Sequence, residues 1–484
     1  MFFDAAEGDR GRFAREFDVC IIGAGPAGIT LARSLAGHGF EVALMEGGGL
    51  DVSVESQDQY VGEIVGMDYV DLDAVRLRVF GGCSEHWSGE CRAFAAEDFE
   101  PLPQRPRAWP IRKADLDPYQ PAAAHILDLA RPVMPADLPM TGDRFRGTPV
   151  QHSAPTRFGQ KYHDEIAAAP RIACGLNANL VDLVLDSDLA TVVGAEFRSY
   201  APDDPGFTVK ARTYCLCLGG LENPRMLLNF NRQKPQGIGN DHDLVGRTFC
   251  EHPSRKVADI RYTHRQELEQ ARVGPTPGFL RAEGTLDFTF RVEWRDYPPD
   301  PLVKALKSGA KCAMPALRRM AETPQGPAPC RWGGAVEEFL VRRYPDSHPT
   351  GWAFMVTEQA LNPDSRVTLA ESVDDFGLRR LRLDWLLGDA PRMPAGVDIV
   401  HGGEWNGGYH QMCTTRMADD PREGVVDRNC RVHGTENLYI GGSSVFGTPG
   451  AVPPTFTIVQ LALRLGDHLD ATRLAGVRAT GTGQ

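Results

Sequence analysis

The hydrophobic pattern is clearest near the N-terminal end of the chain. An apolar run from Phe17 to Ile22 breaks directly into Gly23-Ala24-Gly25-Pro26-Ala27-Gly28. Apolar residues then recur at helical spacing from Ile29 to Leu35, and a second apolar run, Glu41 to Met45, ends at Glu46. This pattern predicts a buried strand, a tight turn, a helix and a second strand with a carboxylate at its end.

The three glycines and the acid have separate physical roles in such a unit. Gly23 suits the tight turn, Gly25 lets the backbone approach a pyrophosphate, and Gly28 lets the helix pack closely on the strand. The helix N-terminus presents free N–H groups and the positive end of its dipole to phosphates. Glu46 stands where a carboxylate accepts hydrogen bonds from ribose hydroxyls. Together they predict a dinucleotide site.

Strands and turns of the same α/β type continue through the first half of the chain. The stretch from Gly47 to Asp73 has a loop-like pattern, and the four prolines between Pro101 and Pro110 predict irregular chain. Further strands are predicted at Arg171 to Leu185, Thr191 to Tyr200 and Tyr214 to Leu218. The last of these leads into a helix that we expect to start near Asn223.

The pattern changes from about His252 to Pro394, where short strands alternate with loops and Pro324 to Pro329 reads as a flexible excursion. The C-terminal residues return to glycine-rich strand, turn and helix, ending in an apolar helix from Thr455 to Leu469. We therefore predict an α/β fold in which a Rossmann-type dinucleotide-binding domain holds an inserted α+β substrate-binding domain. The expected bounds are 1–100, 165–255 and 395–484 for the first domain, and 101–164 and 256–394 for the second.

Composition excludes several other classes of protein. The 484 residues are 42% hydrophobic and 24% charged, with a net charge of -12. An acidic balance argues against nucleic-acid and anionic-membrane partners, and no apolar run has the length of a membrane span. Met1 to Arg15 lacks the apolar core of a signal peptide, so we expect a cytoplasmic protein. The 11 cysteines are then buried reduced thiols, and their spacing predicts no metal site.

The chain carries a single dinucleotide fingerprint, at its N-terminal end, which favours a tightly held FAD over an exchanging NAD. The most distinctive motifs lie in the C-terminal block, where His410-Gln411-Met412-Cys413-Thr414-Thr415-Arg416-Met417 precedes Asn437 to Phe446 and Pro454 to Ile458. This block resembles the glucose–methanol–choline (GMC) family of FAD oxidoreductases. Further matching pieces are Phe80 to Trp87, Trp109 to Ile111, Gly219 to Leu228, Gly246-Arg247, His252-Pro253 and Asn362 to Leu369. Within the family, Gly81 to Trp87 is most similar to the pyranose-oxidase-like branch, whose members act on sugars and glycosides.

The resemblance implies hydride abstraction from the CH–OH carbon of a small molecule, such as a sugar, a glycoside or a secondary metabolite. His410 would be the base that takes the hydroxyl proton, a role that suits an imidazole because its pKa is close to working pH. Reduced flavin would then pass electrons to oxygen or to another acceptor. Besides Gly23, Gly25, Gly28 and Glu46, the implied cofactor contacts are Ala27, Gly82, Ser84, His86, Val181, Gly441, Ser443, Pro454 and Thr455.

His86 belongs to a Ser-x-His-Trp motif in which some sugar-oxidising relatives bond the histidine covalently to the flavin. Other relatives keep a histidine there with a non-covalent flavin. We expect His86 to contact FAD and favour the non-covalent form.

Two positions depart from the family pattern. The family places an Asn or a second His just before its Pro-Thr-x-Thr-Ile motif, and here that residue is Pro453, which has no side-chain donor and no backbone N–H. Cys413 replaces the glycine of the family's His-x-x-Gly-Thr motif and is expected to be a small packed side chain.

The missing polar side chain at Pro453 keeps three functions open. The first is alcohol oxidation with His410 as base. The second keeps FAD but changes the reaction to a dehydrogenation beside a carbonyl, an elimination or a lyase step, each of which needs only one base. The third is a flavoprotein with degraded catalysis. The sequence does not specify the substrate, the electron acceptor or the oligomeric state.

Overall fold

The computed structural model describes residues 1–7, 10–129, 138–139, 143–261, 272–295, 350–387 and 404–481. Within these residues the fold is built on an eight-stranded sheet. Its strands, in spatial order, are β1 (Phe2–Asp4), β9 (Ile172–Leu176), β3 (Val42–Met45), β2 (Glu16–Ile22), β12 (Phe207–Leu216), β11 (Val192–Arg198) and β10 (Asn179–Leu185), with β19 (Leu438–Ile440) also paired to β12.

Strand β2 lies at the centre of the parallel part of this sheet. It pairs in parallel with β3 on one side and with β12 on the other, so that Ile22 is level with both Met45 and Leu216. Strand β19 continues the parallel pairing along the C-terminal half of β12. The carboxyl ends of the parallel strands therefore meet at one edge, which is where ligands bind in open α/β sheets.

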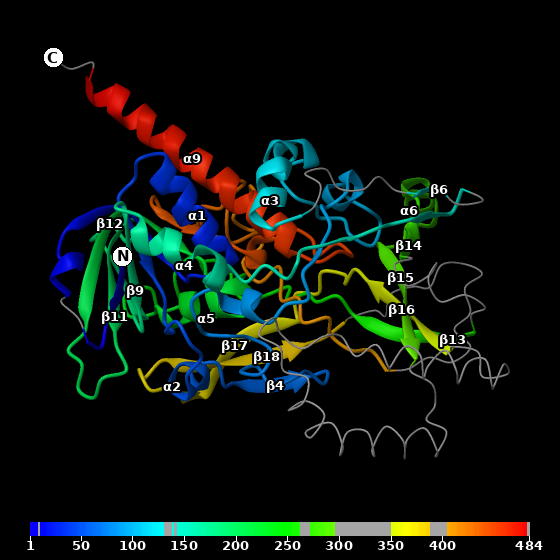
Figure 1. Cartoon of the computed structure of the whole chain (residues 1–484), viewed down its shortest axis with the longest axis horizontal. Coiled ribbons are helices and arrows are strands. Elements are labelled where there is room, and N and C mark those ends of the chain that lie inside the picture. The colour runs from blue at the N-terminus through cyan, green and yellow to red at the C-terminus, as the bar shows by residue number, and fades with distance from the viewer. Residues whose placement is uncertain are drawn as a thin grey trace, which may run out of the picture.

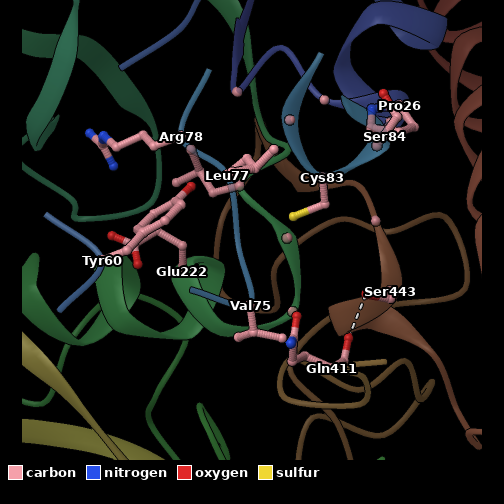
Figure 2. A pocket seen from close by; sticks show the side chains of 18 of the residues that line it. Pro26, Tyr60, Val75, Leu77, Arg78, Cys83, Ser84, Glu222, Gln411 and Ser443 are labelled. Atoms are coloured by element: carbon pink, nitrogen blue, oxygen red, sulfur yellow. Dashed lines mark hydrogen bonds between the residues drawn. The ribbon is translucent and has the colours of Figure 1, made fainter. Parts of the chain in front are cut away.

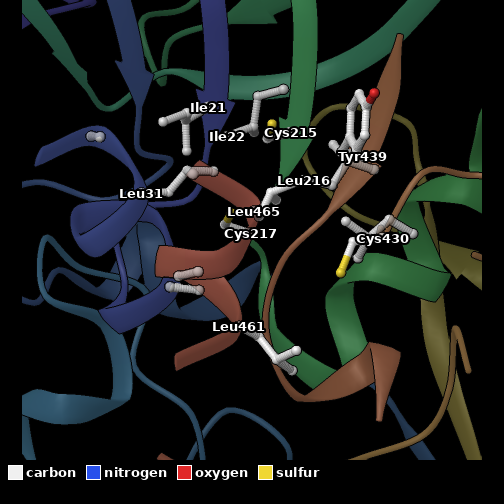
Figure 3. Close-up of a cluster of buried hydrophobic side chains, with 14 of the residues drawn as sticks. Ile21, Ile22, Leu31, Cys215, Leu216, Cys217, Cys430, Tyr439, Leu461 and Leu465 are labelled. Carbon is white, nitrogen blue, oxygen red and sulfur yellow. The ribbon is translucent and has the colours of Figure 1, made fainter. Parts of the chain in front are cut away.

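Helices cover this sheet and close its core. Helix α1 (Pro26–Gly37) follows β2, and the long helix α9 (Thr455–Gly481) packs along α1 (Figure 1). Figure 3 shows Ile21 of β2, Leu31 of α1, and Leu461 and Leu465 of α9 in one buried cluster with residues of β12. Two shorter helices are α3 (Gln120–Ile126) and α4 (Phe158–Ala168). The predicted strand–turn–helix–strand unit is confirmed, and it forms the centre of the molecule.

A second sheet lies beside the first, on the right of Figure 1, and is antiparallel. Its order is β13 (Ser254–Arg261), β16 (Thr350–Thr357), β15 (Phe288–Arg295), β14 (Arg272–Pro275), β7 (Phe145–Gly147) and β6 (Leu138–Pro139), and helix α6 (Pro277–Glu283) follows β14. The Rossmann-type sheet and this separate sheet confirm the predicted fold class. The domain boundaries stay a prediction.

The part of the chain that the structure describes also contains two small sheets. One contains β17 (Arg366–Val373), β18 (Arg379–Trp385) and β4 (Glu63–Gly66), and the other pairs β5 (Glu90–Cys91) with β8 (Gln151–His152). Two further α-helices of the described residues are α2 (Val54–Asp58) and α5 (Gly219–Asn229). Short 3-10 helices are η1 (Arg10–Phe13), η2 (Gly82–Glu85), η3 (Ala96–Phe99), η4 (Lys113–Asp115), η5 (Asp117–Tyr119) and η6 (Ser443–Val445).

The structure differs from the sequence-based expectations at two places. The stretch from Gly47 to Asp73 contains α2 and β4, and β4 pairs with β18, which lies far away in the sequence. Helix α5 begins at Gly219, so Asn223 lies inside the helix rather than at its start. The predicted excursion at Pro324 to Pro329 lies outside the described residues. Among those described, no helix combines the length and apolar character that crossing a membrane requires.

Candidate active site

A cavity of about 670 Å³ opens at the carboxyl edge of the parallel strands. This volume is within the range of roughly 300–1,000 Å³ that small-molecule and cofactor sites occupy. Its walls come from the glycine turn after β2, the segment from Tyr60 to Glu90, the β12–α5 turn, and two stretches of the C-terminal block, Gly408 to Gln411 and Gly442 to Ile458. Segments far apart in sequence thus build one site.

Figure 2 shows how parts of this wall face one another. Pro26, at the start of α1, lies beside Ser84 of η2, while Gln411 and Ser443 lie together farther along the cavity. The Ser443 hydroxyl donates a 2.6 Å hydrogen bond to the Gln411 carbonyl, which joins the two C-terminal stretches. The sulfur of Cys83 points into the space between these two pairs.

Glycines leave room where a bound group needs it. A Cβ added to Gly219 or Gly442 would meet no protein atom within 4 Å, and one added to Gly25 would meet only the Gly82 Cα at 4.0 Å. All four glycines line the cavity, and the N-terminus of α1 begins at Pro26 beside them. An open glycine cradle next to the N-terminus of a twelve-residue helix fits the pyrophosphate of a dinucleotide such as FAD.

The other two turn glycines shape the backbone. Gly23 has φ +102°, and a Cβ there would lie 2.5 Å from the Cys217 carbonyl oxygen. A Cβ on Gly28 would lie 1.9 Å from the Gly23 carbonyl oxygen, so helix α1 can approach the turn only because Gly28 lacks a side chain. These contacts agree with the roles predicted from the motif, a tight turn and close helix packing.

Glu46 lies at the end of β3 and lines the cavity, as the motif predicts. Its carboxylate accepts hydrogen bonds from the backbone N–H of Ala24 at 2.8 Å and of Gly48 at 2.9 Å. The side chain is buried, and burial raises the pKa of its carboxyl group. Glu46 therefore holds the glycine turn against β3, and its contact with a ribose stays a prediction.

Most of the remaining predicted cofactor residues also line the cavity. They are Ala27, Gly82, Ser84, His86, Ser443, Pro454 and Thr455, together with His410. Ser84 is buried and donates to the Gly81 carbonyl at 2.7 Å. His86 is exposed, and partial desolvation, helped by the nearby Arg157 charge, lowers the pKa of its imidazole. Their proximity to one cavity is what a shared ligand requires.

Three predicted residues, Gly28, Val181 and Gly441, lie outside the cavity lining among the described residues. Val181 falls at an irregularity in the pairing of β10 with β11, and its neighbour Leu180 lines the cavity instead. Gly441 supports the wall from behind: its carbonyl accepts from the Asn223 amide at 3.2 Å, and the same amide donates to the Ser444 hydroxyl at 2.9 Å. Asn223 thus connects α5 to the C-terminal turn.

His410 meets a second histidine that the motif analysis did not assign to the site. The Nδ1 atoms of His410 and His252 lie 2.8 Å apart, and the planes of the two rings are inclined by 81°. His252 is 1% exposed, and burial lowers its pKa to about 4. Burial, helped by the charges of His252, Arg291 and Arg272, holds the pKa of His410 well below 6.5. Both rings are therefore neutral near pH 7.

Glu251 fixes the backbone of both histidines. Its buried carboxylate accepts from the backbone N–H of His410 at 2.8 Å and of His252 at 3.1 Å, and the Tyr69 hydroxyl donates to its other oxygen. Burial raises the pKa of Glu251 to about 7. The sequence analysis found His252-Pro253 as a piece that matches the GMC pattern, but nothing in the local sequence assigned a role in the site to His252 or to Glu251.

Pro453 lines the cavity, where it presents no hydrogen-bonding side chain. The second imidazole comes instead from His252, whose Nε2 lies 3.1 Å from the Pro449 carbonyl oxygen. A distant segment thus gives His410 a polar partner, although His252 is not among the residues that line the cavity.

Comparison with known proteins finds similarity to oxidoreductases. A family model described as GMC oxidoreductase matches residues 398–462. The chain is 23% identical to the fructose dehydrogenase large subunit of Gluconobacter japonicus, over 93% of this chain and 97% of that protein. It is 25% identical to 6'''-hydroxyparomomycin C oxidase of Streptomyces lividus, over 96% and 94%. It is 23% identical to 2-methyl-1,2-propanediol dehydrogenase of Mycolicibacterium austroafricanum, over 94% and 95%.

Solved structures share the fold. Pyridoxine 4-oxidase from Mesorbium loti superposes with a TM-score of 0.57 at 15% identity, covering 93% of this chain and 98% of that chain. An FAD-dependent oxidoreductase from Chaetomium thermophilum superposes with a TM-score of 0.58 at 15% identity, covering 95% and 100%.

Proposed function

We propose that this chain is a GMC oxidoreductase that oxidises a small polyhydroxylated alcohol with His410 as the base, on the support of the family-model match and the similar oxidoreductases. The family's members are FAD-dependent and act on the CH–OH group of their donors. The observation that carries the proposal is that His410 lines the cavity that also contains the glycine cradle, while the buried His252 lies behind it with the two Nδ1 atoms 2.8 Å apart.

His410 has the properties that the proton transfer requires. Its ring lines the cavity, and its low pKa keeps it unprotonated near neutral pH, ready to accept the hydroxyl proton. When bound, FAD would supply the acceptor for the hydride that leaves the same carbon. Gly23, Gly25, Glu46, Gly219 and Gly442 would hold that group along the carboxyl edge of the sheet.

The substrate end of the cavity favours a donor with several hydroxyl groups. Glu90 and Arg291 line it beside the ring of Trp87, whose indole N–H donates to the Thr156 carbonyl at 2.9 Å and so fixes the ring. Arg272 contacts Glu90 at 2.5 Å. The carboxylate of Glu90, the guanidinium of Arg291 and the fixed ring of Trp87 suit a sugar or glycoside, because they match its hydroxyls and its apolar ring face.

The relatives support the same substrate class. Their names specify fructose, hydroxyparomomycin C and a methylated propanediol, all of which carry hydroxyl groups. The Gly81 to Trp87 motif, shared in form with the pyranose-oxidase-like branch, favours sugars and glycosides among these. We propose that His86 contacts the flavin without a covalent bond to it.

Anaerobic flavin reduction tests the proposal. The purified protein is mixed with fructose, a methyl glycoside, an aminoglycoside and a vicinal diol while the visible flavin band is recorded. Bleaching by at least one of them is the expected result. A protein that holds FAD but is bleached by none of the alcohols would contradict alcohol oxidation and support the altered reaction or the degraded flavoprotein.

Variants of the two pocket histidines complete the test. The His410→Ala variant should keep FAD and lose flavin reduction, and an unchanged rate would refute its role as base. Acid precipitation of the wild type should leave the flavin in the supernatant. Flavin in the pellet, lost again in the His86→Ala variant, would show a covalent link instead.

A further inference from the structure

The contact between His252 and His410 defines where each proton sits. His252 Nε2 lies 3.1 Å from the Pro449 carbonyl oxygen, and a carbonyl oxygen only accepts hydrogen bonds. His252 Nε2 must therefore carry a proton. A neutral imidazole has one N–H, so His252 Nδ1 carries a lone pair and acts as an acceptor.

The acceptor on His252 sets the tautomer of its partner. The Nδ1 atoms of the two rings are 2.8 Å apart, which is a hydrogen-bond distance that two lone pairs would not sustain. His410 Nδ1 must therefore be the donor. The proton of neutral His410 is then on Nδ1, and its Nε2 holds the lone pair.

We propose that His252 is a positioning residue that holds His410 in the Nδ1–H tautomer and so reserves His410 Nε2 for the proton of the substrate hydroxyl. This inference rests on the proposed function for the identity of that proton. In the step, the O–H bond breaks, its electron pair stays on the oxygen, and an N–H bond forms at His410 Nε2.

The same contact stabilises the product of the proton transfer. Protonated His410 is a cation, and its Nδ1–H still points at the neutral acceptor on His252, so that hydrogen bond becomes charge-assisted. The site is rigid on both sides, because the Glu251 carboxylate holds the two histidine backbones and the Cys250 and Met412 backbones exchange hydrogen bonds of 3.0 and 3.1 Å. His252 thus contributes to the proton transfer only by orienting His410. It lies at a position remote from Pro453 in the sequence.

Histidine NMR reads the tautomer directly, without substrate. The FAD-loaded protein is labelled with ¹⁵N-histidine, and His410 is assigned among the 13 histidines by its absence from the spectrum of the His410→Gln variant. At neutral pH we expect a protonated Nδ1 and an unprotonated Nε2 for His410, and the reverse for His252. The opposite pattern at His410 would overturn the proposal, whatever the outcome with alcohols.

Substitutions at His252 test whether its contact with His410 affects the rate of flavin reduction. Asn keeps an acceptor oxygen near the position of Nδ1, whereas Leu has none. We expect His252→Leu to slow flavin reduction on the order of 100-fold and to lose the fixed His410 tautomer, while His252→Asn stays within about 10-fold of the wild type. Equal rates in both variants, or an unchanged His410 spectrum in His252→Leu, would contradict the positioning role.

His433 provides the matched control. Its Nε2 contacts the Ala418 carbonyl at 2.9 Å, as His252 contacts Pro449, but among the described residues its ring makes no hydrogen bond to His410. The His433→Leu variant should keep the wild-type rate of flavin reduction and the wild-type His410 spectrum. If none of the proteins, wild type included, reduces flavin with any alcohol, the proposed function fails, and the NMR result still decides the tautomer.

Discussion

The backbone N–H of His410 donates to the carboxylate of Glu251 at 2.8 Å, although 159 residues separate them. The same carboxylate receives the backbone N–H of His252, so one buried acid aligns the two segments that bear the histidines. Because burial raises the pKa of Glu251 to about 7, its ionisation falls in a range that experiments can reach.

Replacing Glu251 by Gln should change how stability depends on pH. The folded protein keeps a proton on Glu251 between the ordinary value of 4.5 and about 7, where the unfolded chain has released it. The contribution of Glu251 to the free energy of unfolding is therefore fully present below pH 4.5 and is lost as the pH rises from 4.5 to about 7. Between about pH 5 and pH 8 the unfolding free energy of the wild type should fall by roughly 2–3 kcal/mol relative to Glu251→Gln. Denaturant unfolding at fixed FAD concentration measures this, and parallel curves would contradict it.

A methyl group at Gly23 should disrupt the cofactor turn. In Gly23→Ala the new Cβ would lie 2.5 Å from the Cys217 carbonyl oxygen, at a backbone φ of +102°. Gly39 has a comparable φ of +84°, but a Cβ there would meet no atom within 4 Å. We expect Gly39→Ala to cost about 1–2 kcal/mol of backbone strain and to keep FAD. Gly23→Ala should lose FAD absorbance and unfold at a clearly lower temperature, and equal behaviour of the two variants would exclude a steric role for Gly23.

The departure from the family motif at Cys413 has a conformational cost. Cys413 is buried and has φ +68°, a conformation that favours the glycine of the family pattern. Cys413→Gly should therefore be about 1 kcal/mol more stable than Cys413→Ala. The same two substitutions at Cys215, a buried residue in strand β12, should give the opposite order. Thermal unfolding of the four variants measures both differences, and the same order at both positions would be inconsistent with strain at Cys413.

A buried ion pair away from the cavity should matter for stability. Arg105 Nη1 contacts the two Glu358 oxygens at 2.6 and 2.8 Å, and both side chains are almost fully buried. Arg105→Met leaves that carboxylate unpaired beside Asp98 and Asp287, and should cost roughly 3–5 kcal/mol. The exposed pair Arg422–Asp420, at 2.6 Å, is the control, and Arg422→Met should leave the unfolding free energy unchanged. Similar losses in both variants would argue against an effect of burial.

Local patterns predicted the dinucleotide unit well. The run from Phe17 to Ile22, the glycine turn and Glu46 lie close together in the chain, and each element's partner is its near neighbour in sequence. Apolar periodicity and turn chemistry are properties of short segments, so they can be recognised before any tertiary contact forms. The motif therefore identified the strand, the turn, the helix and the acid together.

Long-range contacts were not predicted in the same way. Strand β4 forms only because β18 offers its edge, and it has no strong pattern of its own. Asn223 was expected to start a helix, but its amide connects Leu218, Gly441 and Ser444 from within the helix. In both cases the deciding partner is distant in sequence, and no short segment carries its signal.

The residues of the candidate site also fall into two groups, those that belong to local motifs and those brought in by long-range contacts. The sequence by itself determined the glycine turn and the position of Glu46, and it predicted a cofactor edge there and a base at His410, because these belong to short motifs with fixed spacing. It also showed a missing polar group at Pro453. Only the tertiary structure brought His252 and Glu251 to His410, because hydrogen-bond partners are selected by proximity in the folded chain and proximity across more than 150 residues is set by packing.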